Sequence, residues 1–364
     1  MTHKEKMISR DQLFLFIIQA QIGVGVLSLP YKLNNSAKGG GGLSVLIAGM
    51  ITQMIIILMW AIMKKFPGLS LYNICLKLFG KFIGRIFIIA YIGYFVLLGA
   101  NIMLSAVEVL HRWLLQSTPR WVSLALFSAM TLYLAREKLT VLARFYTLAT
   151  FLFIPLILLI SYGLTQAHME YMFPLMEKGI VNIIKGARET TISMYGFELM
   201  LIIYPFSQGT DKQKLLSISL ANLFVTLFYV FVVATCLTVF NSEQLKYIPE
   251  PVIYLMKSLN FYIVDRADIL FLPIWAITLV CSIVSYCYGA AVGMSVLFGK
   301  KEHTPFSPLV KVLTFSIALA PMTPAAVHKL DKISEYTAYL FLAGLPLIIY
   351  IFSLFMSKKT GDPA

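Results

Sequence analysis

Long apolar stretches alternate with short polar connections along the whole chain. A helix needs about 20 mostly apolar residues to cross the ~30 Å hydrocarbon core of a bilayer. By this measure the pattern predicts ten membrane-spanning helices, of which the fourth, sixth and ninth are short. The predicted spans are Gln12–Tyr31, Leu43–Met63, Ile86–Val107, Val122–Ala135, Phe145–Leu164, Thr190–Phe206, Leu215–Phe240, Ile269–Phe298, Val312–Val327 and Tyr336–Met356.

The connections between these spans are too short to fold alone, so residues 1–364 are predicted to form a single transmembrane domain. "NNSAKGGGG" (Asn34–Gly42) predicts a flexible hairpin. Lys64–Arg85 carries five basic residues and no acidic one, which favours a short amphipathic helix along the membrane surface. On the other side, Glu177–Glu189 predicts an amphipathic lead-in and Pro249–Tyr262 a short interfacial or re-entrant helix.

The ten spans divide into two halves of five, residues 11–164 and residues 179–356. Because five is odd, the second half must insert upside down relative to the first, as in a five-plus-five inverted repeat. The first span contains Gly23-Val24-Gly25 and the sixth contains Gly196 near its centre. Helix breakers at corresponding places in both halves predict discontinuous helices 1 and 6 around a site at the membrane midplane.

The glycines of the first span admit two interpretations. A break would expose backbone groups that must line a cavity or meet a ligand, and the helix restarting near Val26 would direct its positive end at a carboxylate. Alternatively, Gly23 and Gly25 could form a small-residue packing surface for a neighbouring helix.

Glu198 is the only ionisable residue among the apolar positions of the sixth span, two residues beyond Gly196. An acidic side chain is costly inside a membrane and is by default a hypothesis of function. It could be a counter-charge for an amino group, a proton carrier, or a structural partner for other polar groups.

Two other spans carry polar stripes at helical spacing. The third span has Tyr91, Tyr94, Leu98, Asn101 and Ser105, and the eighth has Ser282, Ser285, Tyr286 and Gly289. Such stripes face protein or water rather than lipid. They could enclose a small amphipathic ligand with the two breaks, or serve only as polar contacts between helices.

Composition supports membrane insertion, since 59% of the residues are apolar and only 13% are charged, about half the charge of a soluble protein. The net charge of +13 does not indicate nucleic acid binding, because it is unevenly placed. The side with the termini collects 18 of the 30 basic residues, Lys311 among them, but six of the 17 acidic ones. Cytoplasmic loops attract Lys and Arg, so both termini are expected in the cytoplasm.

Motifs for catalysis and cofactor binding are absent from the sequence. It has no phosphate-binding glycine loop, HExxH or nucleophile elbow, and its four cysteines lack zinc-ligand spacing. We therefore expect no catalytic residue, no metal and no cofactor. The fifth span has no Lys or Arg beyond Arg144 that could couple transport to protons, although Ser282 and Ser285 could line a cation site.

Four segments carry a resemblance to a known family: "IGVGVLSLP" in the first span, "YGFELMLIIYPF" in the sixth, and "VDRADILFLPIWAI" (Val264–Ile277) and "SYCYGAAVG" in the eighth. With these segments the chain resembles the amino acid/polyamine/organocation permeases. Within that superfamily it is most similar to the spore germination permease family, the B subunits of germinant receptors. Length, span number and short tails agree over essentially the whole chain.

The resemblance implies a subunit that binds a small germinant, commonly an amino acid, in the inner membrane of the spore. Its implied partners are a membrane-embedded A subunit and a lipid-anchored C subunit, with which it signals the start of germination. An ion-coupled amino acid permease is the alternative. The candidate ligand-binding residues, from the breaks, the stripes and the resemblance together, are Gly23, Val24, Gly25, Tyr94, Leu98, Tyr195, Gly196, Phe197, Glu198, Ser282, Ser285 and Tyr286.

Overall fold

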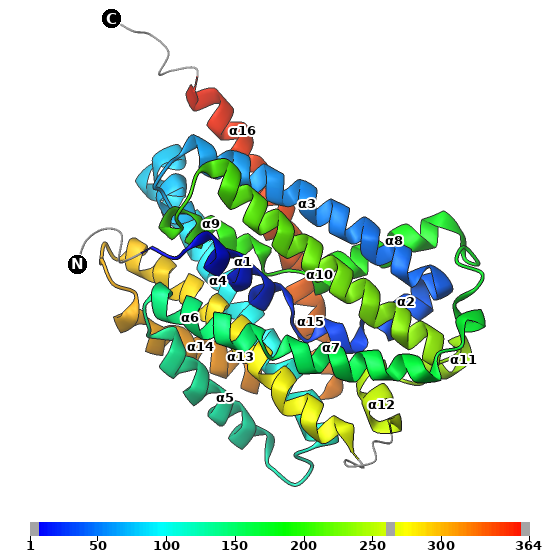
Figure 1. Cartoon of the computed structure of the whole chain (residues 1–364). Coiled ribbons are helices and arrows are strands. Elements are labelled where there is room, and N and C mark those ends of the chain that lie inside the picture. Colours follow the sequence, from blue (N-terminus) through cyan, green and yellow to red (C-terminus); the bar gives the residue numbers. More distant parts are fainter. Residues whose placement is uncertain (1–6, 260–265, 358–364) are drawn as a thin grey trace, which may run out of the picture.

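The structure, a computed structural model, describes residues 7–259 and 266–357 (Figure 1). Within these residues the chain is helical, with no strand beyond an isolated bridge between Ile8 and Ser207. The α-helices are α1 (Arg10–Gln21), α2 (Gly25–Ala37), α3 (Gly41–Lys65), α4 (Leu71–Trp113), α5 (Arg120–Ala135), α6 (Leu139–Thr150), α7 (Phe153–Tyr162), α8 (Gly179–Ser193), α9 (Met200–Ile203), α10 (Asp211–Val239), α11 (Ser242–Leu245), α12 (Pro251–Ser258), α13 (Ala267–Leu297), α14 (Ser307–Leu319), α15 (Pro324–Tyr339) and α16 (Leu345–Ser357).

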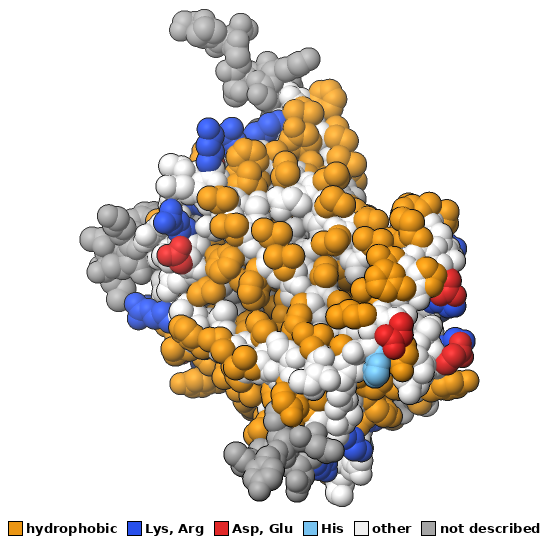
Figure 2. Space-filling model, turned by 45° about the vertical axis from the view of Figure 1, so that its right-hand side comes forward, with side chains coloured by type: hydrophobic (Ala, Val, Ile, Leu, Met, Phe, Trp, Pro, Cys, Tyr) orange, Lys and Arg blue, Asp and Glu red, His pale blue; other side chains and the backbone are white. Residues whose placement is uncertain are grey.

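Six helical stretches of the described chain are long and apolar enough to cross a membrane. They are Gly25–Lys65, Leu71–Trp113, Leu139–Gln166, Asp211–Val239, Ala267–Leu297 and Pro324–Phe355. Arg120–Ala135, Phe197–Phe206 and Thr304–Leu319 are shorter apolar helices. On the face shown in Figure 2, apolar side chains cover the middle, while charged ones lie mainly near the margins. These features are those of a multi-pass membrane protein.

The long helices α4 and α13 pack along each other, and α10 packs along α3. Both α4 and α13 bury many large side chains, including Tyr91, Phe95, Trp275 and Tyr286. In Figure 1, α1 is short and lies between α10 and α6, and α2 continues beyond it after a short bend. This bend is where the candidate site is built.

The connection expected at Asn34–Gly42 is shorter in the structure. Helix α2 continues to Ala37, a 3₁₀ turn covers Lys38–Gly40, and α3 begins at Gly41. The glycines are needed for packing rather than for flexibility: a Cβ on Gly39 would overlap the Met172 carbonyl, and one on Gly40 would lie 2.7 Å from the Leu175 oxygen. The small residues thus allow this turn to pack against the segment that precedes α8.

The predicted limits of the ninth and tenth spans are also wrong. Helix α14 ends at Leu319, and α15 begins at Pro324, where the Thr323 hydroxyl accepts a hydrogen bond from the Ala326 N–H at 3.2 Å. Helix α15 therefore starts well before the predicted Tyr336. Its first turns contain Lys329, Asp331, Lys332 and Glu335, which an average of hydropathy assigns to a loop.

The placement of Lys311 in a cytoplasmic connection is wrong as well, because it lies within α14 and is only 3% exposed. Cys75, also expected in a connection, lies in α4, and all four cysteines are free and buried. Around Lys64–Arg85 the chain forms a helix from Leu71 and breaks at Gly80, which has φ 75°. That the segment before Gly80 lies along the membrane surface stays a prediction.

Candidate ligand-binding site

The first interruption lies between α1 and α2. Helix α1 ends at Gln21, and helical hydrogen bonding resumes in α2 from Gly25. The interruption leaves carbonyl groups of α1 without helical partners. Ser282 Oγ, from α13, donates to the Gln19 carbonyl at 2.9 Å and lies 3.3 Å from the Ile22 carbonyl. The eighth-span serine therefore stabilises the end of α1.

The second interruption follows Ser193, the last residue of α8. Gly196 adopts φ 121°, a value that only glycine takes readily, and a 3₁₀ turn then covers Phe197–Leu199. Gln21 Nε2 donates to the Met194 carbonyl at 3.1 Å, and the Tyr229 hydroxyl donates to the Ser193 carbonyl at 3.0 Å. The hydrogen bond from Gln21 joins the two interruptions, which lie side by side although they are far apart in sequence.

Glu198 is completely buried beside the second interruption and accepts hydrogen bonds with both carboxyl oxygens. Its Oε1 lies 3.0 Å from the hydroxyls of Tyr94 and Tyr286, and its Oε2 lies 2.6 Å from the Gly196 N–H. Three helical elements are thereby joined through one carboxyl group. In this conformation Glu198 acts as a structural partner for polar groups of the protein.

A cavity of about 700 Å³ opens beside the two interruptions. Four of the predicted residues line it: Gly23, Val24, Gly25 and Tyr195. The wall is completed by Asn101 and Ser105 of the third-span stripe and by residues of α2, α8 and α15. The other eight predicted residues lie behind this wall: Tyr94, Leu98, Gly196, Phe197, Glu198, Ser282, Ser285 and Tyr286.

The polar residues behind the wall already have hydrogen-bond partners within the protein. Ser285 Oγ lies 2.8 Å from the Tyr146 hydroxyl and 2.8 Å from the Cys281 carbonyl, so it has partners of its own. Leu98 and Phe197 are fully buried. That any of these residues contacts a ligand stays a prediction.

Three buried oxygen atoms on the cavity wall have no hydrogen-bond partner among the described residues. They are Gln21 Oε1, Asn101 Oδ1 and Ser334 Oγ, on residues that are 1%, 8% and 3% exposed. A buried polar atom without a partner is costly, and each one in a folded protein calls for an explanation. Because each of these oxygen atoms is itself buried, an occupant of the cavity would reach it only after the side chain turned toward the cavity.

The cavity is lined by charges of both signs. Glu108 and Glu250 are already paired, with Arg120 at 3.0 Å and Arg112 at 2.6 Å. Glu189, Asp331 and Glu335 have no ion pair within the described chain, and neither have Lys32 and Lys332. Such a wall suits a small molecule carrying both an ammonium and a carboxylate. The described residues hold no group of three or more His, Cys, Asp or Glu arranged for a metal ion.

Three residues that line the cavity were absent from the predicted set: Gln21, Asp331 and Ser334. Gln21 had a usable signal, since an amide lies two residues before Gly23 in a mostly apolar span. Asp331 and Ser334 had none, because their segment was assigned to the connection before the tenth span.

Lys311 is a second residue of interest that sequence reasoning missed. Its ammonium group is buried in α14, and its only hydrogen-bond contact in the described chain is Met103 Sδ at 3.5 Å. Met103 Sδ also accepts from Ser128 Oγ at 3.4 Å. A thioether is a weak acceptor, so this amine lacks the carboxylate or carbonyl partners that buried lysines usually have.

Replacing Lys311 with methionine is expected to raise the thermal unfolding temperature of the purified protein. Methionine fills a similar volume and removes the cost of burying an amine with a single weak partner. Thermal unfolding in detergent measures this, with Lys301→Met, at an exposed position, as the control. A lower unfolding temperature for Lys311→Met alone would contradict the prediction and show that the amine stabilises the fold.

Comparison with known proteins decides the family. The family model described as "Spore germination protein" matches residues 7–329. The chain belongs to this family. The match confirms the resemblance that the motifs of the first, sixth and eighth spans had indicated.

Individual relatives agree with the family match. The chain is 26% identical to spore germination protein GerQB of Bacillus cereus over 82% of each chain. It is 25% identical to spore germination protein YndE of Bacillus subtilis (strain 168) over 98% of each chain. Spore germination protein B2 of the same strain is 26% identical over 99% of each chain.

A solved structure shares the fold. The transporter MHP1 of the nucleobase-cation-symport-1 family, in a closed conformation with bromovinylhydantoin bound, matches with a TM-score of 0.68. The match covers 95% of this chain and 78% of the transporter at 12% sequence identity. The family member described here therefore has a transporter-like fold.

Proposed function

We propose that the chain is the B subunit of a spore germinant receptor, and that it binds a small germinant, an amino acid, in the cavity beside the two interruptions. The observation that carries this proposal is the cavity beside the two interruptions, whose wall holds charged residues of both signs without an ion pair in the described chain: Lys32, Glu189, Asp331 and Lys332. The family match supports the receptor role. Binding would be non-enzymatic and would need no cofactor.

The proposed architecture is the ten-helix, five-plus-five inverted repeat, with halves at residues 11–164 and 179–356. In it α1 and α2 form the first discontinuous helix, and α8 with the segment through Phe206 forms the sixth. The non-helical turn at Gly196 and the gap between Gln21 and Gly25 support this assignment, as does the shared fold with a transporter.

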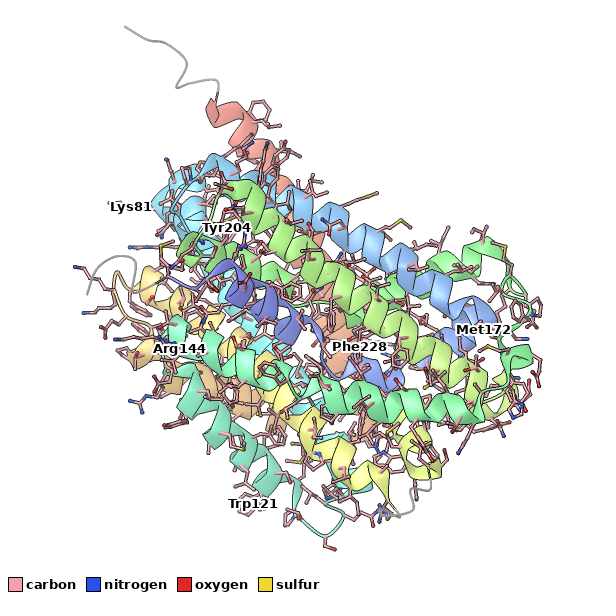
Figure 3. The ribbon with its side chains drawn as sticks, viewed as in Figure 1. Lys81, Trp121, Arg144, Met172, Tyr204 and Phe228 are labelled. Atoms are coloured by element: carbon pink, nitrogen blue, oxygen red, sulfur yellow. The ribbon has the colours of Figure 1, made fainter. Side chains whose placement is uncertain are left out.

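We place both termini in the cytoplasm and the protein in the spore inner membrane. Figure 3 shows Lys81, Arg144 and Tyr204 toward the end of the bundle where α1 begins, and Met172 at the opposite end. The excess of basic residues on the α1 side supports a cytoplasmic assignment for that end. The cavity, lined by Lys32, Asn35 and Glu250 of the Met172 side, would then open outward, toward arriving germinants.

The proposed ligand pose follows from the wall. The ligand carboxylate would meet the N-terminal end of α2 at Gly25, where backbone N–H groups and the helix dipole favour a negative charge. Its ammonium would meet Asp331, which lines the cavity together with Gln21 and Asn101. Tyr94, Ser282 and Tyr286 would support the wall from behind, and ligand occupancy would change the packing of α2 and α8 against the A and C subunits.

An ion-coupled amino acid permease is the second candidate. It is favoured by the shared fold with a cation symporter and by Lys311, a buried amine that could exchange a proton. The two candidates differ in whether the chain alone moves solute.

Reconstitution separates the two candidates. The full chain in liposomes would be tested for thermal shifts with each of the 20 proteinogenic amino acids and for uptake of the labelled compounds under proton and sodium gradients. We expect binding of at least one amino acid without concentrative uptake. Concentrative uptake would replace the receptor by a permease. Absence of binding, also after coexpression with A and C subunits, would overturn the amino acid site.

Gly25→Ala tests the site directly. A Cβ on Gly25 would lie 2.7 Å from Ser193 Cβ and 3.0 Å from Ser193 Oγ, so the two interruptions must move apart. We expect a loss of about ten-fold or more in affinity for the amino acid that binds, equivalent to about 1.4 kcal/mol. Ligand titration by calorimetry measures it.

The matched control adds Ser193→Gly, which removes the two nearest atoms and leaves only Ser193 Cα at 3.2 Å, so the double variant should recover affinity in part. Wild-type affinity in Gly25→Ala, or no recovery in a double variant that folds normally, would place the ligand elsewhere.

A further inference from the structure

A second opening lies at the other end of the molecule, between the inner ends of α4 and α13. This cleft has a volume of about 590 Å³. It shares no lining residue with the cavity beside the two interruptions. We name it the α4–α13 cleft. Its lining residues are Leu76, Lys81, Arg85 and the segment 296–299.

The break at Gly80 shapes one side of the cleft. Gly80 has φ 75°, so the helical segment that contains Leu76 turns away from the one that contains Lys81. The two segments approach closely: a Cβ on Gly84 would lie 2.8 Å from the Cys75 carbonyl oxygen and 2.8 Å from Leu76 Cα. The other side is the last turn of α13, which ends at Leu297 before Gly299 reverses the chain with φ 65°.

The cleft carries an unbalanced positive charge. Lys81 and Arg85 are both exposed and lie four residues apart, so they share one side of the helix. Neither forms an ion pair within the described chain. The whole segment from Lys64 to Arg85 contains no acidic residue. Neither cation is therefore neutralised by a neighbouring carboxylate of the described chain, and both are free to hold an anion.

An exposed apolar stripe begins beside the two cations. Phe82 is 81% exposed, and Ile86 and Ile89 are 53% and 56% exposed at four- and three-residue steps along α4. Phe298, which lines the cleft, is 62% exposed. In a membrane protein this stripe lies against acyl chains. Lys81 itself lies at the edge of the bundle in Figure 3.

We propose that the α4–α13 cleft is a binding site for the headgroup of an anionic phospholipid. Lys81 and Arg85 would hold the phosphate oxygens, and the acyl chains would run along Phe82, Ile86 and Ile89. Basic pockets between helices at the inner membrane surface are suited to such headgroups. Free phosphate is also an anion that Lys81 and Arg85 could bind, but it has no acyl chain to contact the apolar stripe. The bound lipid would hold together the two helices that also carry Tyr94 and Tyr286.

The test uses the delipidated full chain in detergent and native mass spectrometry. Phosphatidylglycerol and phosphatidylcholine with identical acyl chains would be titrated separately, with and without excess inorganic phosphate. We expect retention of phosphatidylglycerol over phosphatidylcholine, and a loss of about ten-fold or more in Lys81→Gln/Arg85→Gln. The matched control is Arg136→Gln/Lys138→Gln, which removes the same charge from another exposed connection and should bind like the wild type.

The proposal would be overturned if the two double variants lost phosphatidylglycerol binding equally. It would also be overturned if the wild type retained phosphatidylglycerol and phosphatidylcholine equally. Displacement of phosphatidylglycerol by inorganic phosphate, with equal binding of short-chain and long-chain lipids, would identify a free-anion site instead. If the double variant does not fold, Lys81→Gln and the charge-preserving Lys81→Arg replace it. The proposal then requires that Lys81→Gln loses phosphatidylglycerol binding and that Lys81→Arg keeps it.

Discussion

Replacing Gly196 with alanine is expected to destabilise the protein by about 3 kcal/mol or more, one of the largest effects of a single added methyl group in this chain. The residue adopts φ 121°, which an L-residue with a side chain rarely takes. An added Cβ would overlap the carbonyl oxygen of Ala20 and lie 2.5 Å from its carbon and 2.9 Å from the Gln21 nitrogen. All three are backbone atoms, so no side-chain rotation relieves the overlap.

The matched control for this substitution is Gly23→Ala. Gly23 belongs to the other interruption, but a Cβ there would have no atom within 4 Å, and its φ is compatible with alanine. Thermal unfolding of both variants in the same detergent measures the difference. Gly23→Ala should leave stability unchanged or slightly raised, because alanine restricts the unfolded chain. If Gly23→Ala lowered stability as much as Gly196→Ala, the close approach of the two interruptions would not be the cause of the loss.

Replacing Glu198 with glutamine is expected to cost about 1–3 kcal/mol of stability. The carboxyl accepts three hydrogen bonds, two at Oε1 from Tyr94 and Tyr286 and one at Oε2 from the Gly196 N–H. An amide has only one oxygen, so its NH₂ group must face either the Gly196 N–H or the two hydroxyls. Glu198→Leu should cost more, because it leaves all three donors without an acceptor inside the membrane.

A double-mutant cycle with Tyr94→Phe tests the origin of this effect. Tyr94→Phe should lower stability less in the Glu198→Leu background than in the wild type, because the acceptor of the Tyr94 hydroxyl is already gone. Glu302→Gln, at an exposed position, is the control and should leave stability unchanged. A stable Glu198→Gln variant that lost only its response to amino acids would contradict the structural role and restore the counter-charge or proton-carrier interpretation.

These two predictions concern the same piece of architecture. Gly196 brings the second interruption against the end of α1, and Glu198 holds the turn to α4 and α13. The first interruption is stabilised from the opposite side by Ser282. In a bilayer each free backbone group would otherwise cost several kcal/mol. The fold therefore supplies its own partners for much of the broken backbone, and a cavity opens beside it.

The candidate site could be predicted in part. Gly23, Val24, Gly25 and Tyr195 line the cavity as members of the predicted set. Glu198 was correctly singled out, but sequence alone left its role open, and the structure turns it toward Tyr94 and Tyr286. Gln21 lines the cavity but was not predicted. Its amide nitrogen donates to the Met194 carbonyl, while its buried oxygen has no partner in the described chain. Nothing in the linear pattern separates these two outcomes.

The sequence by itself determined the membrane class, most of the apolar stretches and the family, and it singled out Gly23, Gly25 and Gly196. These follow from local quantities: the hydropathy of about 20 residues and the missing side chain of glycine. Only the tertiary structure decided which polar groups satisfy one another, that α15 supplies Asp331 to the cavity, and that Lys311 is buried. The physical reason is that an average of hydropathy assigns a segment with charged residues to a loop. Burial and hydrogen bonding depend instead on which helix faces meet in the folded chain.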